Sequence, residues 1–370
     1  MTQHVRGATR LAGLVALLAA GAGNASAHVK YVTTGSDPVE VAAFLLAALT
    51  DPFNLAVLGA GGLGVALGGA AYLRFRPLPN DVRAFRRTMA SYESLLPWLL
   101  RLAVGLPLVG AGFSGYFFSP VVQSSSPVFV RLFGITVGFL LLFGFGTRLV
   151  AAVGLGAYLV GLAVEPALVL AFEYVPGFLA IALVGGGRPS SDHVVASMAA
   201  DDRTFYSRVD PFYRRVALPF VERTRHLESY VPVVLRVGLG LTFVYLGVAQ
   251  KLMEPGGALA VVAKYDLTAV VPVAPELWVV GAGLTEALVG VLLVAGAFTR
   301  AATTVAFLLF TTTLFGLPDD PVLAHISLFG LVSALLVTGG GPLSVDRALS
   351  DRDADDAESD GDASGRSAGA

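Results

Sequence analysis

Residues 275–297 read PELWVVGAGLTEALVGVLLVAGA, and this stretch decides the fold class. As an α-helix it is roughly 34 Å long, enough to cross the ~30 Å hydrocarbon core of a bilayer. Because lipid offers no hydrogen bonds to an exposed backbone, such a segment must be helical. Glu286 lies near its middle. The stretch therefore predicts a transmembrane helix that carries a carboxyl group near the bilayer midplane.

The composition extends this prediction to the whole chain. Hydrophobic residues make up 55% of the 370 residues and charged residues 14%, against about 25% charged residues in soluble domains. The chain has no cysteine, which excludes disulfides, thiol redox chemistry and iron–sulfur clusters. We predict an all-α integral membrane protein with nine transmembrane helices. The other eight predicted spans are residues 53–73, 95–117, 128–146, 149–164, 167–187, 231–252, 301–317 and 321–338.

Both ends of the chain differ from the apolar centre. Positive residues, an apolar run at 11–22 and the tripeptide Ala25-Ser26-Ala27 predict a cleaved signal peptide at residues 1–27, with an uncleaved signal anchor as the alternative. Residues 349–370 are rich in Asp, Glu, Ser and Gly and are predicted to be a disordered acidic tail. The acidic tail and the scarcity of lysine favour a halophilic archaeal source.

Arginines gather in two polar segments, residues 74–87 and 191–230. By the positive-inside rule these segments are cytoplasmic, so we expect a multi-pass protein of the cell membrane with its N-terminus outside and its C-terminus in the cytoplasm. Aromatic residues alternate with arginines in 191–230. Nucleic-acid stacking would use this pattern, but an amphipathic linker on the inner leaflet explains it more simply, and no nucleic-acid partner is predicted.

The chain contains an internal repeat. Residues 92–97 (YESLLP) resemble residues 227–232 (LESYVP) at an offset of 135, and residues 146–148 (GTR) resemble 298–300 (FTR) at an offset of 152. We predict one leading helix followed by two parallel four-helix units related by a pseudo-twofold axis along the membrane normal. The predicted segments are an outer interfacial segment, leading helix and basic loop at 28–94, a first unit at 95–190, a linker at 191–230 and a second unit at 231–348.

The second unit contains several distinctive short motifs, which are 235–241 (LRVGLGL), 247–252 (GVAQKL), 286–290 (EALVG), 297–302 (AFTRAA), His325 and 341–346 (GPLSVD). As a set, these motifs resemble the DoxX family of small four-helix membrane proteins. The first unit resembles it only through the repeat, because Gly115, Tyr116, Gly134 and Glu173 stand where the second unit has Gln250, Lys251, Glu286 and His325; it is predicted to be degenerate and structural.

Ionisable groups inside a bilayer are costly, so each one is a candidate site residue. We select Glu286 and His325 as candidate catalytic residues, and Gln250, Lys251 and Arg236 as candidate cofactor-binding residues. Glu286 either exchanges protons or fixes helix packing. Lys251 is favoured as a snorkelling residue, because Glu286 lies roughly 10 Å deeper by helix rise. No metal site is predicted.

The resemblance implies a quinone-linked or redox-associated membrane subunit, because the family includes a membrane subunit of thiosulfate:quinone oxidoreductase. Quinone is then the expected cofactor, and the partners are the lipid bilayer and a soluble redox protein. Two alternatives stay open, a small-solute transporter and a non-catalytic membrane scaffold. The sequence does not determine whether the chain is itself catalytic, nor its oligomeric state.

Overall fold

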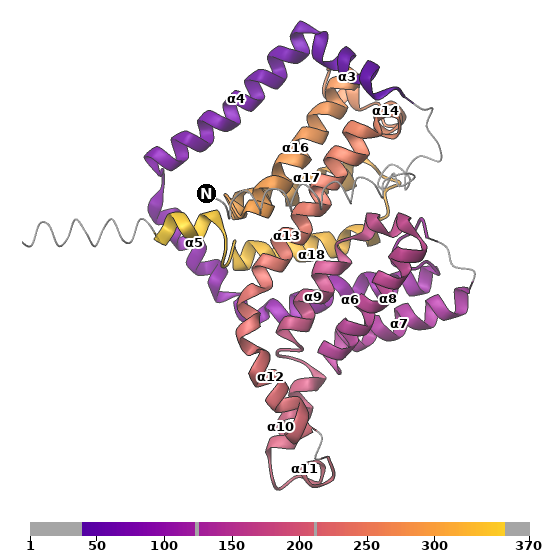
Figure 1. Ribbon diagram of the computed structural model, residues 1–370, viewed down its shortest axis with the longest axis vertical. Helices are drawn as coiled ribbons and strands as arrows, with labels where there is room; N and C mark the ends of the chain where they lie inside the picture. The colour runs from indigo at the N-terminus through magenta and orange to yellow at the C-terminus, as the bar shows by residue number, and fades with distance from the viewer. Residues whose placement is uncertain (1–38, 123–125, 211–212, 352–370) are drawn as a thin grey trace, which may run out of the picture.

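The computed structural model describes residues 39–122, 126–210 and 213–351, and these residues form helices and no strand (Figure 1). The predicted signal peptide at 1–27 and most of the predicted acidic tail lie outside the described residues. The all-helical prediction is therefore confirmed for the part of the chain that the structure describes.

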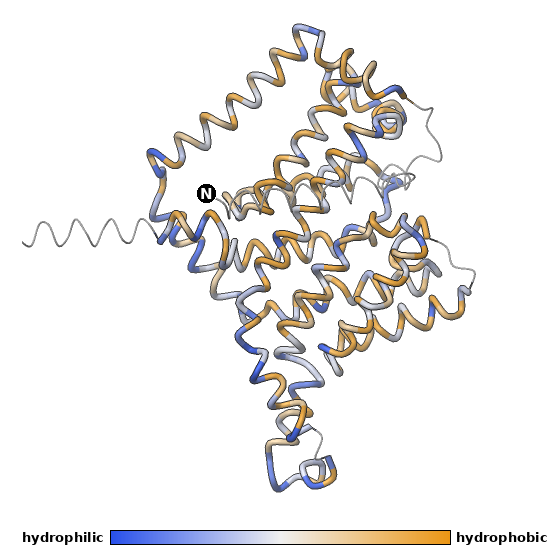
Figure 2. Tube along the Cα trace, viewed as in Figure 1, coloured by the Kyte–Doolittle hydropathy of each residue, from blue (hydrophilic) through white to orange (hydrophobic). Residues whose placement is uncertain are grey.

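Five helical stretches are long and apolar enough to cross a membrane. Figure 2 shows hydrophobic residues along these helices and hydrophilic residues at the turns and in the lower projection. The chain is thus a polytopic membrane protein, although the predicted number of nine spans exceeds the five that pass by length and apolarity. The five are Pro52–Phe75, which is α4; Pro79–Ser114, which joins α5 and α6; Thr147–Val164, which is α8; Tyr213–Met253; and Pro275–Ala295, which is α16.

The remaining predicted spans coincide with shorter or less apolar helices. They are α7 (Pro127–Phe143), α9 (Tyr174–Val184), α17 (Thr299–Gly316) and α18 (Val322–Thr338). The span predicted at 167–187 differs most, because a 3₁₀ helix, η2 (Pro166–Ala171), precedes an α9 of only 11 residues. Tyr158 stabilises this break, since its hydroxyl donates to the carbonyl of Leu168 at 2.7 Å.

The leading segment joins the bundle mainly at one end. Helix α3 (Val41–Thr50), predicted as an outer interfacial helix, buries Phe44 and Ala48 in a cluster with residues of α14 (Pro255–Lys264) and α16. Helix α4 then stands apart from the bundle (Figure 1), with an edge contact between the Tyr72 and Phe298 rings near its other end. The predicted basic loop is itself helical and forms α5 (Pro79–Ser91).

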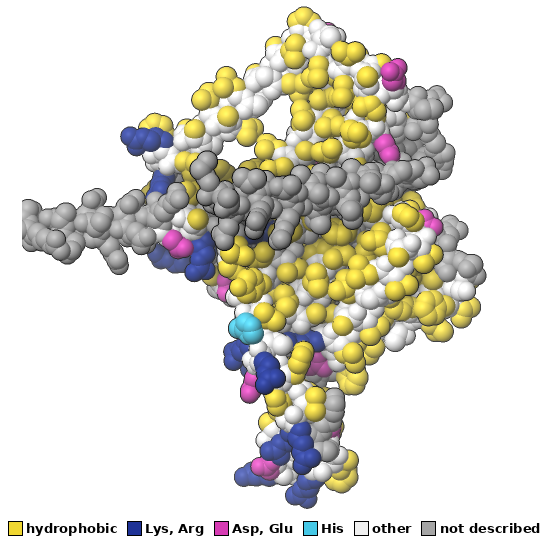
Figure 3. All heavy atoms as spheres, viewed as in Figure 1, with side chains coloured by type: hydrophobic (Ala, Val, Ile, Leu, Met, Phe, Trp, Pro, Cys, Tyr) yellow, Lys and Arg dark blue, Asp and Glu magenta, His cyan; other side chains and the backbone are white. Residues whose placement is uncertain are grey.

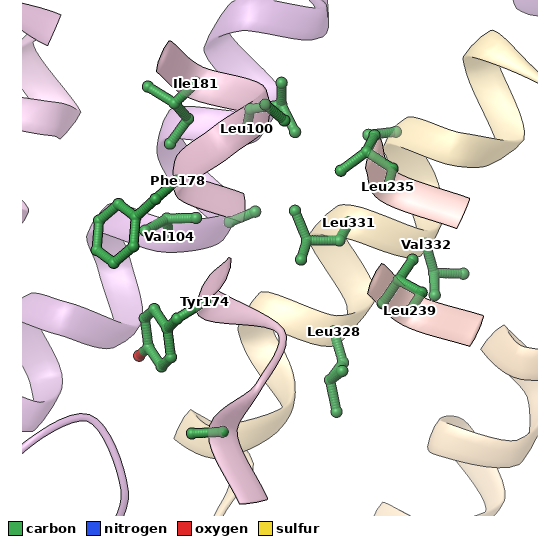
Figure 4. Packing of buried hydrophobic residues seen from close by; sticks show 14 of the residues in the cluster. Leu100, Val104, Tyr174, Phe178, Ile181, Leu235, Leu239, Leu328, Leu331 and Val332 are labelled. Carbon is green, nitrogen blue, oxygen red and sulfur yellow. The ribbon is translucent and has the colours of Figure 1, made fainter. Parts of the chain in front are cut away.

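The core is formed jointly by two groups of helices. We use "first unit" for α6 (Leu96–Ser114) to α9, and "second unit" for α13 (Val231–Val244), its continuation η5 (Tyr245–Met253), α16, α17 and α18. Helix α6 packs against α18, and α9 packs against α13. Figure 4 shows Val104 and Phe178 of the first unit in the same buried cluster as Leu331 and Leu239 of the second. The first helix of each unit therefore contacts the last helix of the other.

Very close backbone approaches hold this interface. A Cβ on Gly330 of α18 would lie 2.3 Å from the Cβ of Ala103 in α6, and a Cβ on Gly238 of α13 would lie 2.4 Å from the ring of Pro176 in α9. Small residues allow helix axes to approach in lipid, where dispersion contacts replace the hydrophobic effect as the driving force. Both crossings therefore depend on glycine.

The predicted linker folds into a helical projection below the bundle (Figure 1). Its surface carries many Arg side chains (Figure 3), together with exposed aromatic residues such as Phe205 and Phe220. This combination of cationic and aromatic side chains is the one expected of a membrane-surface segment. Its elements are α10 (Ser191–Ala200), α11 (Phe205–Val209), η3 (Tyr213–Ala217), α12 (Leu218–Thr224) and η4 (Arg225–Tyr230).

Candidate functional site in the second unit

The centre of the candidate site is an ion pair between two helices. Lys251 Nζ of η5 donates to Glu286 Oε2 of α16 at 2.6 Å. The two side chains are 19% and 18% exposed, so the pair is largely but not wholly buried. The sequence analysis predicted that Lys251 extends toward the membrane surface, whereas in the structure its ammonium group pairs with Glu286.

Glycines bring the two helices together beside this pair. A Cβ on Gly247 would lie 2.4 Å from the carbonyl oxygen of Gly283, and a Cβ on Gly283 would lie 3.0 Å from the carbonyl oxygen of Gly247. The same approach places the Gly247 backbone against Glu286. Because Gly247 and Gly283 have no side chains, the two helices can approach closely enough for Lys251 to reach Glu286.

A long π-helical stretch, η5, carries three of the polar residues of the site. Gln250 Nε2 donates to the hydroxyl oxygen of Tyr245 at 3.1 Å, and the Gln250 side chain is buried. π-helical turns are rare and frequently occur at functional sites. Tyr245, Gln250 and Lys251 are thus presented by an unusual backbone that the apolar pattern of the sequence did not reveal.

His325 is paired with Asp320, whereas Glu286 is paired with Lys251. Its Nε2 lies 3.5 Å from Asp320 Oδ2, and the two side chains are 1% and 0% exposed. The ring of Phe310 meets the imidazole edge-on at 6.2 Å between centroids. An imidazole and a carboxyl group are therefore held side by side in the buried part of the second unit.

Arg236 is not part of this constellation. It lies on α13, about 20 Å from Lys251 by helix rise, and its guanidinium donates to the backbone oxygens of Gly340 at 3.1 Å and Leu343 at 2.7 Å, and also to Val294. Arg101, its counterpart in the first unit, donates to the carbonyl of Pro189 at 2.5 Å. Both arginines therefore join the first helix of their unit to the backbone that follows its last helix.

Each unit has an aspartate, Asp192 or Asp346, that binds the N-terminus of one of its helices. The sequence analysis did not select either residue. Asp346 accepts hydrogen bonds from the backbone N–H groups of Phe298 at 2.7 Å and Thr299 at 2.8 Å, at the start of α17. Asp192 does the same for Gly146 at 2.6 Å and Thr147 at 2.9 Å, at the start of α8. A carboxylate at a helix N-terminus satisfies orphan N–H groups and complements the helix dipole.

A further ion pair, between Lys264 and Asp319, is exposed on the surface of the second unit. Lys264 Nζ lies 2.7 Å from Asp319 Oδ2, and the Tyr265 hydroxyl donates to the same oxygen at 2.9 Å. These hydrogen bonds lower the pKa of Asp319, and the hydrogen bond to Asp319 raises the pKa of Lys264. The contact joins the end of α14 to the turn before α18, next to the buried Asp320.

The fold and these pairs define a polytopic all-helical membrane protein with charged groups held between apolar helices. The DoxX family model matches residues 231–325, so this stretch is a DoxX domain. It includes Lys251, Glu286, Asp320 and His325, and it confirms the resemblance inferred from the sequence of the second unit. No curated protein and no solved structure matches the chain.

Proposed function

We propose that this chain is a quinone-linked or redox-associated membrane subunit whose reactive groups lie in the DoxX domain. The observation that carries the proposal is the Lys251–Glu286 pair, a cation and a carboxylate placed between apolar helices at 2.6 Å. Charged residues inside a membrane are expensive and mark proton, ion or ligand pathways. The partner that this proposal requires is a soluble redox protein.

We further propose that the nine apolar helices form one leading helix and two parallel four-helix units that arose by tandem duplication. The reciprocal packing of α6 on α18 and of α9 on α13 supports a pseudo-twofold axis between the units. The equivalent roles of Arg101 and Arg236, and of Asp192 and Asp346, support it independently. The basic α5 and the basic projection favour cytoplasmic locations by the positive-inside rule, with the N-terminus outside.

The donor set around Lys251 suits a quinone headgroup. Quinone carbonyl oxygens accept hydrogen bonds, and Lys251 offers an ammonium donor beside a carboxylate that can exchange a proton. Because the pair is partly exposed, a headgroup can approach it from the side of the bundle. When bound, a quinone supplies two-electron, two-proton redox chemistry. Glu286 would then take or give a proton while Lys251 holds a carbonyl oxygen.

His325 has a supporting role in this proposal. Its side chain and that of Asp320 are almost fully buried, so a ring-sized ligand does not reach them in this arrangement. The pair can instead store a proton within the same domain. We therefore assign the ligand contact to Lys251 and Glu286, and proton storage to His325 with Asp320.

Mass spectrometry of lipids bound to the mildly solubilised protein tests the proposal. We expect quinone near one equivalent in the wild type, and at least a tenfold loss in Glu286→Gln, because the neutral amide no longer holds Lys251 in place. His325→Ala should also lower the quinone content, by a smaller factor. Glu165→Gln, an exposed glutamate of the first unit, is the matched control and should retain the wild-type content.

Absence of quinone from the wild type, or equal quinone in all four proteins, would refute the quinone proposal. Glu286-dependent flux of solutes into proteoliposomes would then favour a transporter. A scaffold is favoured if Glu286→Gln changes neither flux nor quinone content. In that case the Lys251–Glu286 pair serves only to fix helix packing.

A further inference from the structure

A buried carboxyl group lies at the interface between the two units. Glu173, at the N-terminal end of α9, is 4% exposed. Its Oε1 accepts a hydrogen bond from the hydroxyl of Ser327 in α18 at 3.1 Å. Glu173 therefore belongs to the first unit by sequence and contacts the second unit by its side chain.

Glu173 also lines a small cavity of about 10 Å³, which is room for roughly one water molecule. The polar groups on its wall come from Tyr116, Glu173 and Tyr174, and the apolar wall includes Leu323 and Ala324 of α18. A buried water needs two to four polar partners. These three side chains supply enough of them, so the cavity suits a water in contact with the carboxyl group.

Among the residues that the structure describes, Glu173 has no cationic partner within ion-pair distance. Tyr116 and Tyr174 line the same cavity, and Tyr158, whose hydroxyl donates to a backbone carbonyl, lies beside Tyr174. The guanidinium of Arg131 lies next to Gly115, the residue before Tyr116. His325, on the same helix as Ser327, is paired with Asp320. An ionised carboxylate in such a place would be costly, and a neutral carboxylic acid would not.

We propose that Glu173 is a proton-binding site at the interface between the two units. In the balanced step, a hydronium ion in the cavity gives its proton to the carboxylate and leaves a water and a carboxylic acid. The first unit, which the sequence presented as degenerate, then has a titratable group of its own. Glu173 stands at the repeat position that His325 occupies in the second unit, so each unit holds a protonatable side chain at the same point. This site does not depend on quinone binding.

Infrared difference spectroscopy of the purified full chain tests the assignment, between a near-neutral buffer, in which exposed carboxyl groups are already ionised, and an alkaline buffer. We expect a carbonyl band of a protonated carboxyl group that disappears on alkaline titration. Glu173→Gln should abolish this band, because the amide keeps the shape and the Ser327 contact but cannot release the proton. Glu165→Gln, with an exposed side chain, and Glu286→Gln, whose carboxylate is paired with Lys251, should both retain it.

Ser327→Ala provides a second measurement that does not require a change at Glu173. Removal of a hydrogen bond to the carbonyl strengthens the C=O bond, so we expect the band to move to higher wavenumber. A band that persists in Glu173→Gln would overturn the proposal. So would the absence of any protonated carboxyl band in the wild type, or a Ser327→Ala spectrum identical to that of the wild type.

Discussion

Lys251→Met is expected to destabilise the protein by about 3 kcal/mol, because it leaves the Glu286 carboxylate between apolar helices without its cation. The two side chains are less than one-fifth exposed, so solvent can compensate only in part. Methionine keeps the unbranched apolar stem of lysine and is only one atom shorter, so the loss of charge dominates the effect. Thermal unfolding in mild detergent, followed by circular dichroism, measures the change.

Lys264→Met is the matched control, since Lys264 pairs with Asp319 on the surface. These side chains are 40% and 60% exposed, and exposed ion pairs contribute little to stability. We expect its unfolding to remain close to that of the wild type. If both lysine variants lost stability equally, the special role of the buried pair would be wrong.

The second large effect is expected from Gly330→Leu. A Cβ at this position would already lie 2.3 Å from the Cβ and 2.9 Å from the Cα of Ala103. A leucine must therefore push α18 away from α6, which opens the core that the two units share. Overpacking of a tight core commonly costs 1–3 kcal/mol, and because backbone must move here we expect at least about 3 kcal/mol.

Gly281→Leu separates this steric effect from the general effect of adding a large apolar residue. A Cβ on Gly281 of α16 meets no atom within 4 Å, so the variant should fold and unfold like the wild type. The readouts are the yield of monodisperse protein in mild detergent and its unfolding temperature. A Gly330→Leu protein as stable as Gly281→Leu would contradict the interface between α6 and α18.

The helices themselves could be predicted from hydropathy, and the DoxX resemblance could be predicted from the motifs of the second unit. Hydropathy measures how apolar the side chains are and does not detect changes in backbone conformation. It therefore predicted a single span at residues 167–187. The structure divides this stretch into η2 and a short α9, with Glu173 at the division. A polar residue within an otherwise apolar run was the available signal for that break.

The Lys251–Glu286 pair could not be predicted from depth alone. A uniform rise of 1.5 Å per residue placed the two groups roughly 10 Å apart along the membrane normal. The backbone of η5 is π-helical, with more residues per turn, and the lysine side chain is long and flexible. Together these features let the ammonium group reach a carboxylate deeper in the bundle.

The aspartates that close the two units were missed for another reason. Asp192 and Asp346 act on the N-termini of helices about 45 residues earlier in the chain, so no local pattern reveals their role. A signal existed in the repeat, because each unit ends in three glycines followed five residues later by an aspartate. Comparison of the two ends would have singled out both residues.

We expect Lys251 and Glu286 to act as one unit inside the DoxX domain, and a double-mutant cycle measures the coupling between them. The four proteins are the wild type, Lys251→Met, Glu286→Gln and the double variant, compared by free energy of unfolding in the same detergent. The paired geometry predicts a coupling free energy of at least about 1.5 kcal/mol, with the double variant more stable than Lys251→Met. A coupling within about 0.3 kcal/mol of zero, the range expected for independent sites, would show that the two residues do not act together.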